Sequence, residues 1–263
     1  MEKTLRLCDD GSHTLFSERV NECYHSIYGA YTESMHIFIN FGFRAVIECD
    51  SFKKNVSGQK INLFKNQEDE VTQRLISNLE PETKLNIVRI LEVGFGTGLN
   101  ALLTALEAEK TKTPVSYLGL EPFPIIPSTL QQLNYCKLLS GNSEQFFTEM
   151  HAGAWNKSYK LHTDFCFKKQ QIGFMEAELK VAGYDLIYFD AFSPEAQPEL
   201  WETNVFEKCF DVLADDGILV TYCAKGAVKR ALKSAGFTIE NLPGPPGKRE
   251  ITRARKLIAF ETC

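Results

Sequence analysis

Short apolar runs alternate with amphipathic stretches along the last two thirds of the chain. The apolar runs predict strands over 88–93, 115–120, 160–165, 184–190, 217–223, 237–242 and 251–260, and helical spacing predicts helices over 99–110, 128–139, 171–181, 198–213 and 225–235. This alternation predicts an α/β fold with a mostly parallel seven-stranded sheet between helices. The last two strands have no helix between them, so we expect the last strand to be antiparallel.

The first third of the chain has a different pattern. Runs rich in Ile, Phe and Val at 35–41 and 44–48 predict two paired strands, with a turn near Gly42. The segment 68–79 has apolar residues at helical spacing and predicts one amphipathic helix. We therefore expect a small N-terminal β-rich cap over 1–84 and a main domain over 85–263.

Composition narrows the class of protein. The chain has 263 residues, of which 44% are hydrophobic and 24% charged, which is ordinary for a soluble globular protein. No run approaches the ~18 apolar residues that a membrane helix needs, and the N-terminus has no apolar core typical of a secretory signal. We expect a cytoplasmic protein with no membrane partner, and a monomer because no heptad pattern occurs.

The cysteines do not indicate a metal site. There are eight of them, and none forms a C-x-x-C pair. Scattered cysteines of this kind are typical of reduced thiols in a cytosolic enzyme, several of them buried. We therefore expect no bound metal.

Three alternating glycines follow the first strand of the predicted sheet. The sequence Glu92-Val-Gly94-Phe-Gly96-Thr-Gly98 lies between the strand over 88–93 and a helix, where α/β proteins bind nucleotide-like cofactors. A dinucleotide fingerprint has its third glycine one residue later. The pattern instead resembles motif I of S-adenosyl-L-methionine (SAM) methyltransferases. It predicts a Rossmann-like methyltransferase fold, with Glu92 and the three glycines at the cofactor.

Acidic residues also follow the next two predicted strands. Glu121 ends the strand over 115–120, where it could accept hydrogen bonds from ribose hydroxyls, and Asp164 ends the third strand near the expected adenine edge. Acids at strand ends also serve as helix caps. However, ligands of open α/β sheets lie at the carboxyl ends of strands, so Glu92, Glu121 and Asp164 together favour a cofactor site.

The fourth predicted strand ends in Asp190-Ala-Phe192-Ser-Pro194. This segment resembles the Asp/Asn-Pro-Pro-Tyr/Phe loop of amino-group methyltransferases, although a strand-end N-cap is the structural alternative for Asp190. An alkylamine titrates near pH ~10.4, so losing its proton at pH 7 costs roughly 4 to 5 kcal/mol. An ionised carboxylate favours the ammonium. The expected work of Asp190 is therefore to orient the nitrogen and accept its proton.

The basic residues are unevenly distributed. The net charge of −5 does not indicate a nucleic-acid binder, yet nine basic residues lie between 225 and 256, opposed only by Glu240 and Glu250. Such local asymmetry is typical of a nucleic-acid contact. A solvated helix face with a charged edge strand would give the same pattern.

Several blocks of the sequence resemble the methyltransferase domain of the MnmC family. The resemblance runs from about Leu15 to Phe260, and its most specific blocks are Gly-Phe-Gly-Thr-Gly-Leu-Asn at 94–100 and Asp-Ala-Phe at 190–192. Further matching blocks lie at 24–26, 33–39, 198–201 and 247–250.

The resemblance implies a tRNA enzyme. It would methylate the aminomethyl group of 5-aminomethyl-2-thiouridine at the anticodon wobble position, giving 5-methylaminomethyl-2-thiouridine, with Asp190 as the catalytic residue. MnmC proteins normally carry an FAD-dependent oxidoreductase domain after the methyltransferase. The sequence stops at Cys263, so it resembles a stand-alone methyltransferase, whose precursor would arrive by another route.

The resemblance also gives the basic segment a use. We expect a tRNA anticodon stem-loop as partner, with phosphate contacts from this segment and stacking of the flipped base on Phe192. The expected substrate-binding residues are Phe192, Lys225, Lys229, Arg230, Lys248 and Arg249.

Other functions remain open at this point. A spermidine-synthase-like aminopropyltransferase shares the fold and the acid after the fourth strand, and another amine methyltransferase would share the site. A nicotinamide dehydrogenase would bind no SAM, and a silent tRNA-binding module would bind tRNA without turnover.

Overall fold

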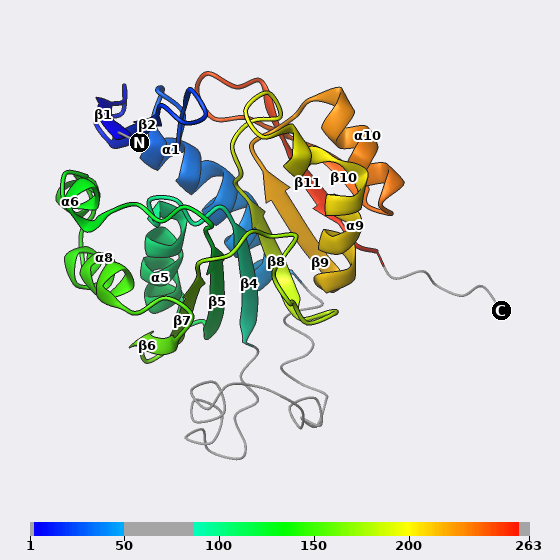
Figure 1. Ribbon diagram of the computed structural model, residues 1–263. Coiled ribbons are helices and arrows are strands. Elements are labelled where there is room, and N and C mark those ends of the chain that lie inside the picture. Colours follow the sequence, from blue (N-terminus) through cyan, green and yellow to red (C-terminus); the bar gives the residue numbers. More distant parts are fainter. Residues whose placement is uncertain (1–2, 50–86, 258–263) are drawn as a thin grey trace, which may run out of the picture.

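The structure is a computed structural model that describes residues 3–49 and 87–257 (Figure 1). Its centre is one large twisted sheet, covered by helices on both faces. The helix expected over 68–79 and the expected domain boundary after residue 84 lie outside the described residues.

The large sheet has eight strands in the order β10-β11-β9-β8-β4-β5-β7-β6. Five neighbouring strands, from β9 to β7, run parallel, and β11 is antiparallel to both of its neighbours. The strands are β4 (Val88–Val93), β5 (Val115–Leu120), β6 (Ser158–His162), β7 (Phe165–Gln170), β8 (Tyr184–Phe189), β9 (Leu213–Thr221), β10 (Thr238–Pro243) and β11 (Glu250–Arg255). The predicted mostly parallel sheet with an antiparallel last strand is confirmed, and β6 adds an antiparallel edge.

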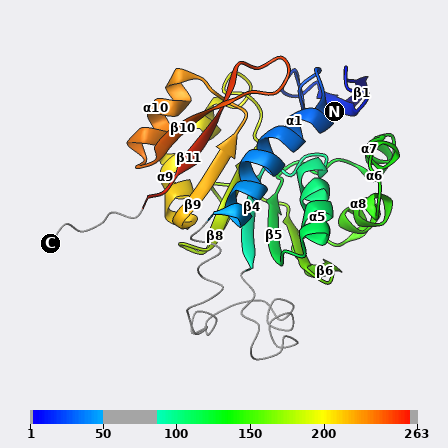
Figure 2. The ribbon, with the colours of Figure 1, turned by 180° about the vertical axis from the view of Figure 1, so that it is seen from behind.

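Helices cover the sheet in two layers. On one face lie α9 (Thr203–Val212) and α10 (Gly226–Ser234), which bury Val205, Phe206, Val228 and Leu232 (Figure 1). On the other face lie α5 (Leu99–Thr111) and an N-terminal helix over residues 30–48, both in front of the sheet in Figure 2. The helix α8 (Ser143–Ala152) packs beside α5. Burial of these apolar faces stabilises the fold.

Three short strands form a separate antiparallel sheet near the N-terminus. They are β1 (Lys3–Leu7), β2 (His13–Ser17) and β3 (Glu22–Cys23), in the order β1-β2-β3. This small sheet lies near the carboxyl ends of the parallel strands (Figure 1). It supplies the small N-terminal sheet that the sequence predicted, although from different residues.

The strands predicted over 35–41 and 44–48 are wrong. The chain there is one continuous helix: α1 (Ala30–Ser34), the π-helical η1 (Met35–Phe43) and α2 (Arg44–Glu48). Gly42 is a point of close approach inside it, because a Cβ there would meet Tyr188 at 3.0 Å and Val220 at 3.2 Å. The helix packs on the sheet core on several sides, and this burial overrides the strand propensity of Ile and Phe.

The predicted third strand, 160–165, is also placed wrongly. Two strands occupy this region: β6 runs antiparallel to β7, with a tight turn before Phe165. Asp164 lies in that turn, and its carbonyl accepts a hydrogen bond from the Val115 amide at the start of β5. Asp164 therefore lies at the amino edge of the sheet, opposite the end where the glycine turn lies.

No helix forms over 171–181; the segment is a series of turns. Phe174 and Ala177 are buried against the sheet. Lys208 on α9 donates hydrogen bonds from Nζ to the carbonyls of Phe174, Met175 and Ala177, at 2.8, 2.9 and 2.8 Å. A tertiary partner therefore satisfies carbonyls that a helix would have used internally.

Two predicted helices are divided. The stretch 198–213 forms a 3-10 turn, η2 (Pro198–Trp201), followed by α9, and 128–139 forms α6 (Pro127–Leu130) and α7 (Tyr135–Leu138). Within the described residues, no helix is both long and apolar enough to cross a bilayer.

Candidate active site

Strand register brings three of the predicted site residues to one edge of the sheet. Val93, the last residue of β4, pairs with Leu120 of β5 and Phe189 of β8, which are the last residues of their strands. The next residues along the chain are Gly94, Glu121 and Asp190. They therefore lie side by side at the carboxyl edge, where open α/β sheets bind ligands.

The glycine turn needs its glycines. Gly94, Gly96 and Gly98 have φ of +92°, +50° and +78°, a region that side chains other than glycine rarely adopt. A Cβ on Gly94 would lie 2.5 Å from the carbonyl oxygen of Asp190. The first two glycines line the cavity above the sheet, whereas Gly98 lies behind them at the start of α5.

Glu121 is held rigidly at the end of β5. Its Oε2 accepts a hydrogen bond from the Gly96 amide at 3.0 Å, and its Oε1 accepts one from the Phe123 amide at 2.8 Å. The carboxylate lines the cavity directly beside the turn. This placement suits a hydrogen-bond acceptor for the hydroxyls of a ribose.

Asn100 joins two acidic residues of the site. Its Nδ2 donates hydrogen bonds to Glu92 Oε1 at 3.0 Å and to Asp190 Oδ2 at 2.8 Å. Both Asn100 and Glu92 are buried. Glu92 therefore supports the site from beneath and does not line the cavity itself. Asn100 was not among the predicted site residues. Its position in the glycine motif, two residues after Gly98, could have identified it as part of the site.

Asp190 has an unusual protonation equilibrium. Burial raises the pKa of its carboxyl group to about 7, and the Glu33 carboxylate acts in the same direction. The hydrogen bond from Asn100 and the charge of Lys248 oppose this shift. Burial and the charge of Asp190 also raise the pKa of Glu92 well above its usual value. Asp190 is thus a better proton acceptor than an ordinary aspartate.

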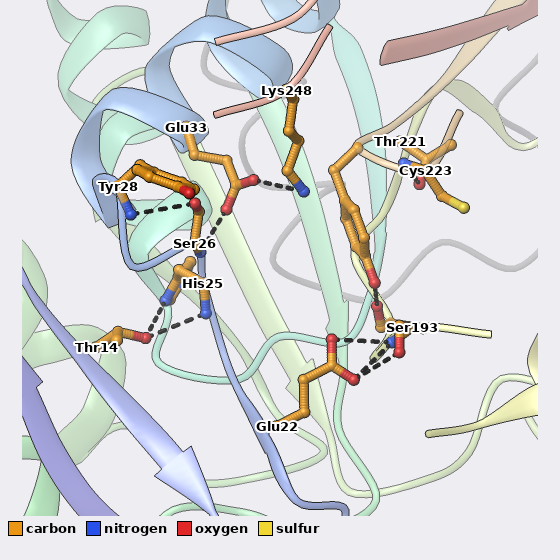
Figure 3. A network of polar contacts seen from close by, with 12 residues as sticks. Thr14, Glu22, His25, Ser26, Tyr28, Glu33, Ser193, Thr221, Cys223 and Lys248 are labelled. Atoms are coloured by element: carbon orange, nitrogen blue, oxygen red, sulfur yellow. Dashed lines mark hydrogen bonds and ion pairs between the residues drawn. The ribbon is translucent and has the colours of Figure 1, made fainter. Parts of the chain in front are cut away.

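The N-terminal sheet closes the site over the loop that follows Asp190. The Ser193 hydroxyl donates a hydrogen bond to Glu22 Oε2 at 2.7 Å, and the Ser193 amide donates to the same carboxylate (Figure 3). From the other side, the Tyr222 hydroxyl donates to the carbonyl of Ala191 at 3.0 Å. The loop carrying Asp190 is therefore held between β3 and Tyr222, the residue that directly follows β9.

Aromatic rings line the cavity next to Asp190. Phe192 and Tyr24 contact each other edge to face, with ring centroids 4.9 Å apart, and both line the cavity. Trp201 is buried and donates a hydrogen bond from Nε1 to the Phe192 carbonyl at 2.8 Å. Trp201 thus positions Phe192 and belongs to the core.

The cavity has a volume of about 660 Å³, within the usual range for cofactor sites. Its residues suit SAM: the glycine turn admits a close backbone contact, and Glu121 offers an acceptor. Leu120, Phe123 and Ile172 supply apolar walls for a base. Gly94, Gly96 and Glu121 are the described residues that would hold this cofactor, with Gly98 shaping the turn. Asp164 is at the opposite edge of the sheet and is not part of this cavity.

The predicted RNA-binding cations divide into two groups. Lys248 lines the cavity and pairs with Glu33, Nζ to Oε1 3.0 Å (Figure 3). The others lie outside the cavity lining, on α10 or its N-cap and in the loop before β11; they are Lys225, Lys229, Arg230 and Arg249. The cavity residues that the sequence did not predict include Glu22, Tyr24, Glu33 and Tyr222. Tyr24 and Glu33 do fall in blocks that carry the family resemblance.

Comparisons with known proteins agree with this geometry. A family model described as S-adenosyl-L-methionine-dependent methyltransferase matches residues 142–257. The MnmC2 protein of Aquifex aeolicus has a solved structure with a TM-score of 0.65 and 22% identity, and the match covers 96% of this chain and 70% of that one.

Curated relatives are bifunctional proteins of tRNA 5-methylaminomethyl-2-thiouridine biosynthesis, called MnmC. That of Paracidovorax citrulli is 31% identical over 186 residues, 66% of this chain. That of Burkholderia vietnamiensis is 27% identical over 255 residues, 93% of this chain. The chain spans only 28% and 34% of the length of these two relatives.

Fold, glycine turn and comparisons together define a SAM-dependent methyltransferase. Within this class, the chain is similar to the methyltransferase part of the MnmC proteins.

Proposed function

We propose that the protein N-methylates the aminomethyl group of 5-aminomethyl-2-thiouridine at the tRNA wobble position, giving 5-methylaminomethyl-2-thiouridine. The observation that carries this proposal is Asp190, an acid with its pKa raised to about 7 beside a SAM-type glycine turn. We infer the substrate from the relatives, which are named as proteins of tRNA 5-methylaminomethyl-2-thiouridine biosynthesis.

The raised pKa of Asp190 makes amine deprotonation easier. SAM supplies an electrophilic methyl group when bound. The attacking nitrogen must first lose a proton, and an alkylammonium titrates near ~10.4. Transfer to an ordinary carboxylate at ~3.9 would cost about 9 kcal/mol, whereas transfer to a group at about 7 costs about 4 to 5 kcal/mol. Asp190 therefore serves as an orienting group and proton acceptor, with Asn100 fixing its carboxylate.

A nucleobase that enters the cavity needs aromatic side chains to stack on. The phosphates of its RNA backbone need cationic side chains nearby. Phe192 and Tyr24 offer ring faces and edges next to Asp190, which suits a flipped nucleobase. Lys229 pairs with Glu250 and Lys225 with Glu195. Such surface pairs are weak, so RNA phosphates can replace the carboxylates. We propose Lys225, Lys229, Arg230 and Arg249 as phosphate contacts of the anticodon stem-loop.

The test is incubation of the protein with SAM and tRNA from a host that lacks this methylation, followed by nucleoside mass analysis. We expect a gain of one methyl group, +14 mass units, on 5-aminomethyl-2-thiouridine. Absence of this product, together with methylation of another amine, would overturn the proposed substrate. A larger adduct would indicate aminopropyl transfer instead.

A further inference from the structure

Glu33 is a buried carboxylate in the wall of the active-site cavity, and the mechanism above does not use it. Its side chain is 9% exposed, and Oε1 lies 3.0 Å from Lys248 Nζ. Its Oε2 accepts a hydrogen bond from the Ser26 amide at 2.8 Å (Figure 3). Glu33 disfavours ionisation of Asp190 and is itself buried, so its place in the cavity wall indicates a further role.

The position of Glu33 is fixed by the turn between β1 and β2, which carries Asp10 and Ser12. The Ser12 hydroxyl oxygen accepts hydrogen bonds from the amides of Ala30 and Tyr31, at 3.0 and 3.2 Å. Asp10 Oδ2 accepts one from the Thr32 amide at 2.9 Å. These bonds satisfy the first turn of α1, so the helix holds Glu33 at the cavity independently of Lys248.

Lys248 shows what kind of group Glu33 can hold. Its primary ammonium contacts the carboxylate and also lies 4.1 Å above the ring centroid of Tyr222. The Tyr222 hydroxyl in turn donates to the carbonyl of Ala191, the neighbour of Asp190. A carboxylate and an aromatic face thus bind one alkylammonium next to the catalytic loop.

The charge of the cavity lining favours binding of a second cation. Seven acidic side chains line it, against two that are cationic, Arg19 and Lys248. His25 also lines it, and burial lowers the pKa of that imidazole to about 4, so it is neutral at pH 7. An aminomethyl substrate carries the same chemical group as the end of Lys248.

We propose that Glu33 and the face of Tyr222 form the subsite that receives the ammonium of the substrate, and that Lys248 occupies this subsite until the substrate displaces it. The inference rests on the proposed function, because it assumes an amine substrate. Glu33 is then a binding residue for the amine, separate from Asp190.

The proton balance of this arrangement is simple. The ammonium is bound by Glu33 and gives one N–H proton to the Asp190 carboxylate, which becomes a neutral acid. The nitrogen lone pair then forms the new N–C bond as the S–CH3 bond of SAM breaks. The electron pair of that bond would go to sulfur, and S-adenosylhomocysteine would be the neutral leaving group. The methylated product is again a cation, and Asp190 returns its proton to water as the product leaves.

Two charged groups shift the pKa of Asp190, and they are Glu33 on α1 and Lys248 in the β10–β11 loop. Asp190 in turn helps to raise the pKa of three groups near it: Glu92 on β4, Tyr117 on β5 and Tyr222, which directly follows β9. Glu33 raises the pKa of Asp190 and Lys248 lowers it. Removing these two charges one at a time should therefore move the acid limb of the pH–rate profile in opposite directions.

The first variant is Glu33→Gln, which keeps the size of the side chain. Loss of a charged hydrogen-bond partner should lower kcat/KM for the aminomethyl tRNA about 10- to 100-fold, mainly through KM. The acid limb should move to lower pH, and the Kd for SAM should stay within about 2-fold. Glu207→Gln, on the exposed surface of α9 and outside the cavity lining, is the matched control and should change none of these values.

The second variant is Lys248→Met, which tests the proposal even if Glu33→Gln does not fold. Its acid limb should move to higher pH, and its KM should fall or stay unchanged because the competing ammonium is gone. The salt dependence of tRNA binding should also stay unchanged. A rise in KM with a salt slope smaller by about 1 would assign Lys248 to a phosphate and overturn the proposal.

These outcomes are separable from failure of the proposed function. The wild-type protein must first methylate the aminomethyl tRNA; if it does not, the proposed function fails. If the wild type is active and Glu33→Gln keeps its KM and its acid limb, the function stands and the Glu33 subsite is wrong.

Discussion

Asn100 Nδ2 lies 2.8 Å from Asp190 Oδ2 and donates a hydrogen bond to it. The same amide bonds Glu92 at 3.0 Å. One buried residue of the glycine motif therefore connects the cofactor turn to the proposed catalytic carboxylate.

Replacement of Asn100 should impair both catalysis and stability. In Asn100→Ala, Asp190 loses the hydrogen bond that opposes its raised pKa, so the acid limb of the rate profile should move to higher pH. We expect kcat to fall about 10- to 100-fold, and the free energy of unfolding to fall by about 1 to 3 kcal/mol because two carboxyl groups lose a donor. Asn241→Ala, an exposed position on β10, is the control. Unchanged kcat and pH profile in Asn100→Ala would contradict this role.

The acid predicted at the ribose, Glu121, and the acid predicted at the adenine edge, Asp164, should behave differently. Glu121→Gln should weaken SAM binding about 10- to 100-fold in calorimetry, because its carboxylate lines the cavity and is bound by two amides. Asp164→Asn removes a charge at the opposite edge of the sheet and should leave the Kd within about 2-fold. The reverse ranking would place the cofactor elsewhere.

Asp190 should destabilise the protein at high pH. Its pKa rises from 3.8 in the unfolded chain to about 7 in the folded protein. The folded state therefore binds the proton more tightly, and stability falls as pH rises from about 4 to about 7. Asp190→Asn should be more stable than the wild type at pH 8, by on the order of 1 to 3 kcal/mol, with a smaller gain at pH 5. Urea unfolding at both pH values measures this, and an equal gain at both would refute the shift.

The glycine turn can be tested by two alanine substitutions. Gly11 and Gly94 both have positive φ, +81° and +92°, but an added Cβ on Gly11 meets nothing within 4 Å. Gly11→Ala should therefore cost only backbone strain, about 1 kcal/mol. Gly94→Ala must also displace the Asp190 carbonyl, 2.5 Å from its Cβ, and should cost about 1 to 3 kcal/mol more and lower kcat. Equal costs in urea unfolding would show that the Asp190 carbonyl moves freely.

Arg249 should contribute to RNA binding through its charge. In Arg249→Ala, the slope of log K against log salt for tRNA binding should become smaller by about 1. Lys160→Ala, on the edge strand β6, should leave the slope unchanged. Equal slopes for all three proteins would remove Arg249 from the interface.

The parallel sheet could be predicted because its strands and the helix α5 carry local signals. Glu121 and Asp190 could be placed for the same reason: each directly follows a clear apolar strand, β5 or β8. Asp164 could not, because β7 contains Lys168 and Lys169 and does not look like a buried strand. Lys169 is in fact buried and donates to the His151 carbonyl at 2.9 Å, a tertiary bond that no local pattern reveals.

The N-terminal helix was missed for a tertiary reason. Residues 35–43 are apolar on nearly every side, which matches strand propensity but reflects burial of η1 against α5, β8 and β9. Because Glu33 lies on the same helix, its place in the cavity also depended on contacts far apart in the sequence.

The most direct test of the central claim is a comparison of Asp190→Ala with the wild type in two assays, methyl transfer to aminomethyl tRNA and SAM binding. If Asp190 orients and deprotonates the amine, turnover of Asp190→Ala should fall at least about 100-fold while the Kd for SAM stays within about 2-fold. Retained turnover, or loss of SAM binding in the variant, would contradict the assignment of Asp190 as the group that orients and deprotonates the amine.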